Sequence, residues 1–441
     1  MSKSFKRSIT LLIILGLAWI AYLPVLFRPD KPSKWERQTK PAPALSVLAA
    51  PPDWGSLEIY QNTITREEFE RLLITVFTTG DAWRSCIEIS ETEARIKTGT
   101  APTDPLFYLR FALTGQSATS PPRHWRTAAE LPPSAPAQPL AGLKIAIDPG
   151  HIGGAWAKME ERWLVVGEGT PVCEGDMTLQ VAQLLKPQLE ALGATVSLAR
   201  EKAEPVTPIR PEALLTVARE ASRPDASPAE IQRTAERLFY RTAEIRARAD
   251  LVNQVLKPDL VLCLHFNAEA WGDPRHPILI DRNHLHLVLN GAYNDDEVLL
   301  ADQRFALLQK LLQRTHREEV LVGSTVAQVF AEISGLPAYG YPPESRNALP
   351  ISGQPYLWAR NLLANRLYDC PVIFMEPYVM NSTIDYARIQ TGDFDGLREI
   401  AGKMYPSIFR EYADGLAAGL AKSYSSQRSA AKIVPLPTDI R

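Results

Sequence analysis

Along residues 140–424, short apolar runs alternate with longer segments in which apolar residues recur at helical spacing. Three of the runs, LKIAIDPG (143–150), DLVLCL (259–264) and CPVIFM (370–375), are typical of strands that are buried on both faces. The segment MTLQVAQLLKPQLEAL (177–192) predicts a helix, although its internal proline should kink or interrupt it. Strands that alternate with helices predict an α/β domain whose mostly parallel sheet is covered on both faces.

The first 28 residues have a different pattern. Lys3, Lys6 and Arg7 precede an uncharged, mainly apolar stretch over residues 8–27. About twenty apolar residues in a helix can span a hydrocarbon core of roughly 30 Å, and basic residues in front of such a stretch favour export of the chain on its C-terminal side. Residues 1–28 therefore predict a signal anchor, with a cleaved signal peptide as the alternative. Either interpretation places the protein outside the cytoplasm, in the periplasm or an equivalent extracytoplasmic space.

Two Pro-rich stretches, 29–55 and 120–139, lack periodic apolar spacing and predict linkers. They enclose a small α+β module over residues 56–119. Within it, residues 57–60 indicate a strand, and residues 65–77 indicate a helix that opens with a capping box. We find no catalytic constellation in this module and interpret it as a packing or spacing unit.

The C-terminal end combines a predicted helix with a predicted disordered tail. Apolar spacing indicates a last helix over about 400–424, and residues 425–441 are interpreted as disordered. The segment over about 205–247 is charged and predicted to be largely helical.

Composition narrows the class of protein. A chain of 441 residues is too long for one ordinary core, so two folded units with connectors are expected. The net charge of −2 gives no basic patch or stripe that would indicate a nucleic-acid partner. The four cysteines are too scattered for a disulfide scaffold and show no paired zinc-binding spacing. A disulfide between Cys263 and Cys370 is left open in an oxidising compartment.

Residues suited to metal chemistry come after three of the predicted strands. His151, His265 and Glu376 each stand directly after an apolar run, and Glu174 precedes the predicted helix. In an α/β sheet, ligands bind just outside the carboxyl ends of the strands. Two histidines and a glutamate are a suitable ligand set for catalytic zinc, which keeps one position open. A further carboxylate nearby can accept a proton from water at such a site.

The sequence of these segments resembles that of the zinc-dependent N-acetylmuramoyl-L-alanine amidases, which cleave peptidoglycan. The matching segments occur in the family's order: IAIDPGHIGG (145–154), EGDMTLQVAQLLKPQLEALGATVSLAR (174–200), RADLVNQVLKPDLVLCLHFNA (248–268) and VIFMEPYVMNS (372–382). The resemblance implies a three-layer α/β domain over 140–424 with a mixed, mainly parallel sheet.

The same resemblance assigns roles to individual residues. It makes His151, Glu174 and His265 the zinc ligands and Glu376 the catalytic glutamate. Arg248 matches an arginine whose role is structural support. Asn267, in the HFNA element, either contacts substrate or fixes its loop.

This sequence also departs from the family. The stretch between His151 and Glu174 is long and contains the rival ligands Glu160, Glu161 and Glu168. Insertions are expected near 203–240 and 271–361, and the second one either shapes a groove or covers the site. Pro377-Tyr378 stands where the family has a glycine after the catalytic glutamate. His284 and His286, in the second insertion, are interpreted as surface or loop residues.

The implied function is hydrolysis of the amide bond between N-acetylmuramic acid and L-alanine, with peptidoglycan, the membrane and a protein activator as expected partners. One alternative is another exported zinc peptidase or amidohydrolase that acts on peptides. The other is a non-catalytic cell-wall binding or regulatory protein with a degenerate amidase domain.

Overall fold

The computed structural model describes residues 44–113 and 121–433, and these residues form one compact unit. The predicted anchor over residues 8–27 lies outside the described residues. Within the described ranges, no helix has both the length and the apolar character needed to cross a bilayer.

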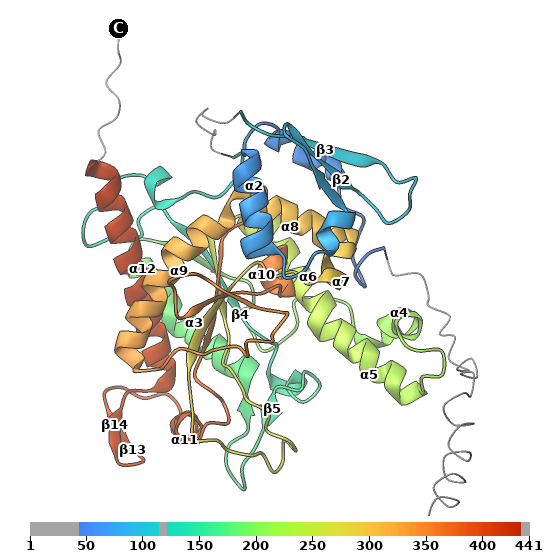
Figure 1. Ribbon diagram of the computed structural model, residues 1–441. Helices are drawn as coiled ribbons and strands as arrows, with labels where there is room; N and C mark the ends of the chain where they lie inside the picture. Colours follow the sequence, from blue (N-terminus) through green and yellow to red (C-terminus); the bar gives the residue numbers. More distant parts are fainter. Residues whose placement is uncertain (1–43, 114–120, 434–441) are drawn as a thin grey trace, which may run out of the picture. The chain divides into compact units, whose positions relative to one another are not determined.

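A seven-stranded sheet lies at the centre of the molecule (Figure 1). Its strand order is β10-β11-β9-β12-β8-β4-β7. Neighbouring strands are parallel except for the pairs β10–β11 and β9–β12, so the sheet is mixed, as expected. In chain order its strands are β4 (Lys144–Pro149), β7 (Thr195–Leu198), β8 (Leu260–Leu264), β9 (Leu285–Leu289), β10 (Leu349–Pro350), β11 (Leu357–Ala359) and β12 (Val372–Pro377).

Successive residues of the central strands face two different cores, because side chains alternate along a strand. In β8, Leu260, Leu262 and Leu264 belong to the core shared with α3 (Glu174–Ala191), α9 (Thr315–Ser334) and α12 (Ile408–Ile433). Val261 and Cys263 belong to the core on the other face, shared with α6 (Glu244–Asp250), the π-helical turn η8 (Leu251–Leu256) and α10 (Leu363–Leu367). Helices therefore cover both faces of the sheet, as Figure 1 shows.

The predicted break in the first long helix does not occur. Helix α3 runs through Pro187 without interruption, from Glu174 to Ala191. Its buried side chains, among them Val181, Leu185 and Leu189, pack into the core beneath the sheet. Tertiary packing therefore holds the helix together across the one hydrogen bond that the proline cannot donate.

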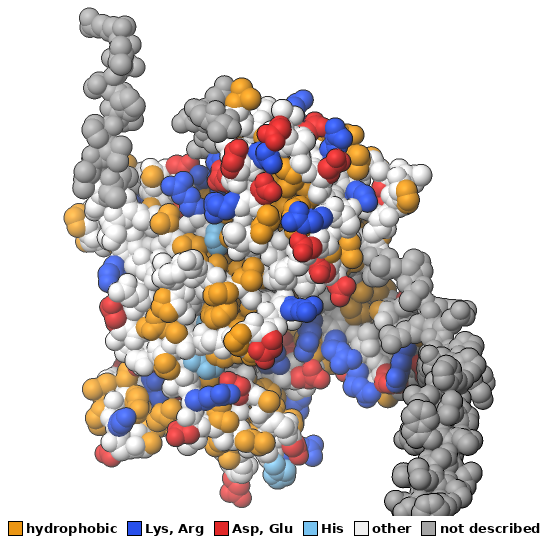
Figure 2. Space-filling view, viewed as in Figure 1, with side chains coloured by type: hydrophobic (Ala, Val, Ile, Leu, Met, Phe, Trp, Pro, Cys, Tyr) orange, Lys and Arg blue, Asp and Glu red, His pale blue; other side chains and the backbone are white. Residues whose placement is uncertain are grey.

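The small module consists of α2 (Arg66–Leu72), followed by the π-helical turn η2 (Leu73–Phe77), and a three-stranded antiparallel sheet, β1 (Ile87–Ile89), β2 (Glu93–Lys97) and β3 (Leu106–Arg110). The strand predicted over 57–60 is wrong, since Trp54–Tyr60 forms a 3-10 helix. Leu57 and Tyr60 are both buried, and their spacing of three suits a 3-10 turn. Figure 2 shows charges of both signs mixed over the surface near β2 and β3. Arg95 of β2 pairs with Glu93 at 3.0 Å and lies 3.8 Å from Glu88.

Both predicted insertions are ordered parts of the fold. The first contains η6 (Pro211–Leu214), α4 (Leu215–Ala221), α5 (Pro228–Leu238) and η7 (Phe239–Ala243), which leads directly into α6. The second supplies three strands of the central sheet, β9, β10 and β11, together with α7 (Asp295–Leu299), α8 (Ala301–Gln313) and α9. Other elements are the short strands β5 (Trp163–Leu164) and β6 (Val172–Cys173), helix α11 (Thr383–Gln390) and the hairpin of β13 (Arg398–Ile400) and β14 (Lys403–Tyr405). There are also 3-10 turns η3 (Ala82–Ser85), η4 (Ala128–Glu130) and η5 (Gly154–Trp156), of which η4 lies within the predicted linker over 120–139.

The C-terminal helix begins later and ends later than predicted. Residues 398–405 form the β13–β14 hairpin, and α12 runs from Ile408 to Ile433, so disorder from Ser425 onward is wrong as far as Ile433. Tyr424 is buried, and Arg428 donates to the Ala141 carbonyl at 2.7 Å, which fixes this part of the helix to the domain. The disulfide left open by the sequence is not formed, since Cys263 and Cys370 are free, buried thiols.

Candidate metal centre

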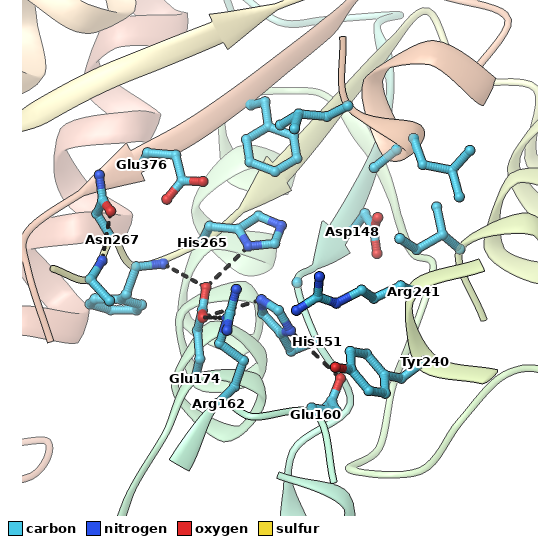
Figure 3. A pocket seen from close by; sticks show the side chains of 18 of the residues that line it. Asp148, His151, Glu160, Arg162, Glu174, Tyr240, Arg241, His265, Asn267 and Glu376 are labelled. Atoms are coloured by element: carbon cyan, nitrogen blue, oxygen red, sulfur yellow. Dashed lines mark hydrogen bonds and ion pairs between the residues drawn. The ribbon is translucent and has the colours of Figure 1, made fainter. Parts of the chain in front are cut away.

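The candidate residues meet at the carboxyl ends of β4, β8 and β12, which are mutually parallel neighbours. His151 lies in the turn after β4 and adopts a left-handed backbone conformation (φ 61°). His265 comes directly after β8, Glu376 lies at the end of β12, and Glu174 is the first residue of α3. Figure 3 shows these four side chains around one pocket.

Three of the side chains come close enough to share an ion. One ligand atom each from His151, Glu174 and His265 lies within 4.8 Å of the others. Nε2 of His151 is 3.2 Å from Oε2 of Glu174, and Nδ1 of His265 is 3.1 Å from Oε1 of the same carboxylate. Two imidazoles and a carboxylate match the ligand set of catalytic zinc sites, so these residues fit a metal ion.

The carboxylate also determines the charge of its neighbours. Burial would raise the pKa of Glu174, but the imidazoles of His151 and His265 lower that pKa well below its ordinary value. Burial would lower the pKa of His151, yet the carboxylates of Glu174 and Glu160 raise it to about 9. Without an ion, a proton on His151 therefore balances the buried carboxylates, and an ion that binds there would displace it.

The rival carboxylates lie in other positions. Glu160 is buried, with Oε1 3.6 Å from Nδ1 of His151, and it accepts hydrogen bonds from the amides of Ile152 and Gly153. Glu160 therefore orients the His151 imidazole through Nδ1, whereas Nε2 of the same ring faces Glu174. Glu161 accepts from the Tyr240 hydroxyl at 3.1 Å, and Glu168 is exposed.

Arg248 supports the turn that carries His151. Its guanidinium pairs with Asp148 at 2.8 Å and with Glu244 at 2.7 Å, and it donates to the carbonyl oxygens of Pro149 and His151. All three charged groups are buried. Burial would raise the pKa of Asp148, but the Arg248 cation lowers it, so the pair stays ionised.

Glu376 lies in the same pocket, which has a volume of about 690 Å³. Burial raises the pKa of Glu376, while the nearby His265 imidazole opposes that shift. The ring of His265 stacks on Phe374 with centroids 4.3 Å apart, which holds the imidazole against the end of the sheet. Asn267 also lines the pocket, and its side-chain oxygen accepts from the Ala268 amide at 2.6 Å.

Two features of the site were not expected from the sequence. Arg162, next to β5, places its Nε 3.3 Å from Oε2 of Glu174 and lines the pocket. The surface or loop interpretation of His284 and His286 is wrong, because both are buried beside Tyr339, and His286 lies within β9 directly opposite Glu376 of β12. The strand period in HLHLVL was the only signal in the sequence for the second feature.

The known proteins that this chain resembles in a comparison are solved structures. No protein-family model matches the chain, and no curated protein matches it. The chain is similar to the N-acetylmuramyl-L-alanine amidase Ami1 of Mycobacterium smegmatis, with 17% identity, coverage of 65% of this chain and 99% of that one, and a TM-score of 0.36. It is also similar to the amidase AmiC2 of Nostoc punctiforme, with 14% identity, coverage of 64% and 97%, and a TM-score of 0.34. A third similar structure is the CwlD amidase of Clostridioides difficile in complex with the GerS lipoprotein, with 11% identity, coverage of 64% and 99%, and a TM-score of 0.35.

Proposed function

We propose that the protein is a zinc-dependent amidase that cleaves the bond between N-acetylmuramic acid and L-alanine in peptidoglycan. The observation that carries this proposal is the convergence of His151, Glu174 and His265 within 4.8 Å in a pocket that also contains Glu376. The resemblance of IDPGH (147–151) and HFNA (265–268) to the amidase motifs supports the choice of substrate.

His151, Glu174 and His265 would hold the zinc ion. When bound, zinc supplies a Lewis acid that polarises a carbonyl group and lowers the pKa of water to about 7. The protein's own contribution is to fix the three ligands, since Glu160 orients one imidazole, Phe374 stacks on the other, and the Phe266 amide donates to Glu174 at 3.1 Å.

Glu376 is assigned the proton transfers. Its carboxylate accepts a proton from the water that attacks the scissile carbonyl carbon and returns it to the nitrogen of L-alanine as the C–N bond breaks. Burial raises its pKa toward the range where both steps are efficient. The products are the free lactyl carboxyl group of the sugar and an intact stem peptide.

The test is the Glu376→Gln variant of the full chain, with intact muropeptides as substrate. We expect this variant to bind zinc as tightly as the natural protein and to lose roughly 10²- to 10⁴-fold in kcat. Mass spectrometry of the products distinguishes an amidase, which releases whole stem peptides, from a peptidase, which cuts within them. Near-normal turnover by Glu376→Gln would reject the role of this residue.

A matched control is Glu269→Gln, which changes another pocket carboxylate that pairs with Arg282 at 2.9 Å. We expect it to keep the zinc affinity and to lose far less activity than Glu376→Gln. Bound zinc without hydrolysis by the natural protein would favour the degenerate, non-catalytic alternative.

Peptidoglycan as substrate implies an extracytoplasmic location. We propose that residues 8–27 anchor the protein to the cytoplasmic membrane and that residues 29–43 of the predicted linker separate the folded unit from it. The remainder of that predicted linker, 44–55, belongs to the folded unit, since the Ser46 amide donates to Asp302 at 2.7 Å. A protein activator remains a proposal that rests on the resemblance. Fractionation of cells that express the full chain, with and without residues 1–28, tests the anchor.

A further inference from the structure

Arg162 reaches the metal centre through a short hairpin that comes after the His151 turn. Strands β5 and β6 pair antiparallel, with Trp163 opposite Cys173. The next pair in this register is Arg162 with Glu174, and the Glu174 amide donates to the Arg162 carbonyl at 3.3 Å. The backbone therefore fixes an arginine beside the carboxylate that begins α3.

The side chain of Arg162 points to the proposed ion position. Its Nε lies 3.3 Å from Oε2 of Glu174, the same oxygen that is 3.2 Å from Nε2 of His151. Figure 3 shows the guanidinium beside Glu174 and His151, with Glu376 on the other side of His265 in this view. Arg162 and the proton-transfer residue thus approach the pocket from different directions.

Other arginines of the pocket are engaged elsewhere. Arg248 is buried against Asp148 and Glu244, and Arg360 donates to the Tyr341 hydroxyl at 3.2 Å. Arg241 is more than half exposed and pairs with Glu161 at 3.4 Å. Arg162 is 35% exposed, its Nη1 donates to the Glu161 carbonyl, and its Nη2 makes no hydrogen bond to a described residue. A cation with an unused donor therefore lines the pocket beside the carboxylate of Glu174.

We propose that Arg162 is a second catalytic residue, whose guanidinium donates to the carbonyl oxygen of the scissile amide as that oxygen gains negative charge. This inference rests on the proposed amidase function. Water adds to the carbonyl carbon as Glu376 takes its proton, and the C=O π electrons move to the oxygen that Arg162 contacts. The electrons return to re-form C=O as the C–N bond breaks and the amine leaves with the proton. A fixed donor that meets charge present only in the transition state raises kcat rather than ground-state affinity.

The experiment compares the natural protein with Arg162→Gln, Arg162→Lys and the control Arg223→Gln, which alters a surface pair with Glu230 outside the pocket. Zinc affinity is measured by titration of the metal-free protein, and kcat and KM are measured on muropeptides at saturating zinc. We expect Arg162→Gln to lose roughly 10²-fold in kcat, with KM and zinc affinity within about threefold. Arg162→Lys should recover part of the loss, because it retains the charge but not the planar fork.

Three outcomes overturn the inference. A loss of activity in Arg162→Gln that excess zinc restores means that Arg162 only holds Glu174 in place. A rise in KM with an unchanged kcat means that it binds the ground-state substrate. An unchanged kcat and KM means that it takes no part in the reaction. If the natural protein binds zinc but releases no stem peptide, the proposed function fails, and that result is independent of the Arg162 variants.

Discussion

The carboxyl group of Glu319 on α9 is buried between the helix and the sheet, where it accepts a hydrogen bond from the Val372 amide at 3.1 Å. Burial raises its pKa to about 7, more than the nearby Lys310 ammonium lowers it. Because the folded-state pKa lies above the unfolded value, the folded state favours the protonated form. That stabilisation is complete below about pH 4.5 and is lost as the pH rises through about 7.

We therefore expect Glu319→Gln, which cannot ionise, to be more stable than the natural protein at pH 8, by roughly 1–3 kcal/mol. The difference should shrink towards zero at pH 5. Denaturant unfolding at both pH values measures it. The control is Glu332→Gln, an exposed position on the same helix, which should show no such pH dependence. A Glu319→Gln variant that is less stable at pH 8 would contradict this interpretation of the buried carboxyl group.

At the residue scale, three residues of the candidate site could be identified from the sequence because each stands alone after an apolar run. His151, His265 and Glu376 are polar residues that end buried strands, which is a strong local signal. Arg162 has no such signal. It depends on a hairpin of two-residue strands, and only the paired backbone brings it to Glu174.

At the scale of elements, the position of α3 depends on a close contact with the turn after β4. A Cβ atom at Gly175 would lie 2.3 Å from the Gly153 amide nitrogen and 2.6 Å from the Ile152 carbonyl carbon. Both are backbone atoms, so a side-chain movement cannot relieve the overlap. The Thr178 hydroxyl donates to the Gly150 carbonyl at 2.7 Å and fixes the same contact. The contact between the start of α3 and the turn therefore fixes the position of Glu174 relative to His151.

We expect Gly175→Ala to push the start of α3 away from the turn and to reduce zinc affinity roughly 10- to 100-fold, as the loss of other supporting contacts around metal ligands does. Zinc titration of the metal-free variant measures the effect. Gly323→Ala, inside α9, is the matched control, since its Cβ would meet only side-chain atoms at 3.5 Å or beyond. It should bind zinc normally and gain up to about 1 kcal/mol in stability. Equal zinc affinity in the two variants would refute the role of the Gly175 contact.

The direction of one central strand, β9, could not be predicted from the sequence. Strands β4, β8 and β12 are visible as long apolar runs, and their parallel arrangement is expected from the helices between them. Strand β9 begins directly after His284 and contains His286, so its apolar pattern is weak, and it enters the sheet antiparallel to β12. Nothing local encodes that direction, because it results from how the chain returns through α7, α8 and α9.

At the scale of the whole molecule, the small module shares a buried cluster with helices α7 and α8 of the α/β domain. Apolar side chains of the module pack against α8, and the buried cluster includes Leu307, Leu308 and Leu311 of that helix. Arg304, also buried on α8, donates to the Lys97 carbonyl at 2.9 Å. The Tyr293 amide donates to the Phe77 carbonyl at 2.8 Å, so backbone hydrogen bonds join the two parts as well.

Because this cluster and these hydrogen bonds tie the module to α8 and to the chain after β9, we expect the module and the central sheet to unfold together. Leu308 is fully buried in the shared cluster, so Leu308→Ala should cost about 2–5 kcal/mol. Leu262 lies in a different buried cluster, so only unfolding of the module and the sheet as one unit would accelerate hydrogen exchange by similar factors at Ile96 of β2 and at Leu262 of β8. Leu106→Ala, on the exposed face of β3, should change neither rate appreciably. If Leu308→Ala accelerates exchange in β2 while β8 keeps its protection, the module opens alone, and the residues on α8 form an interface between two separately folding parts.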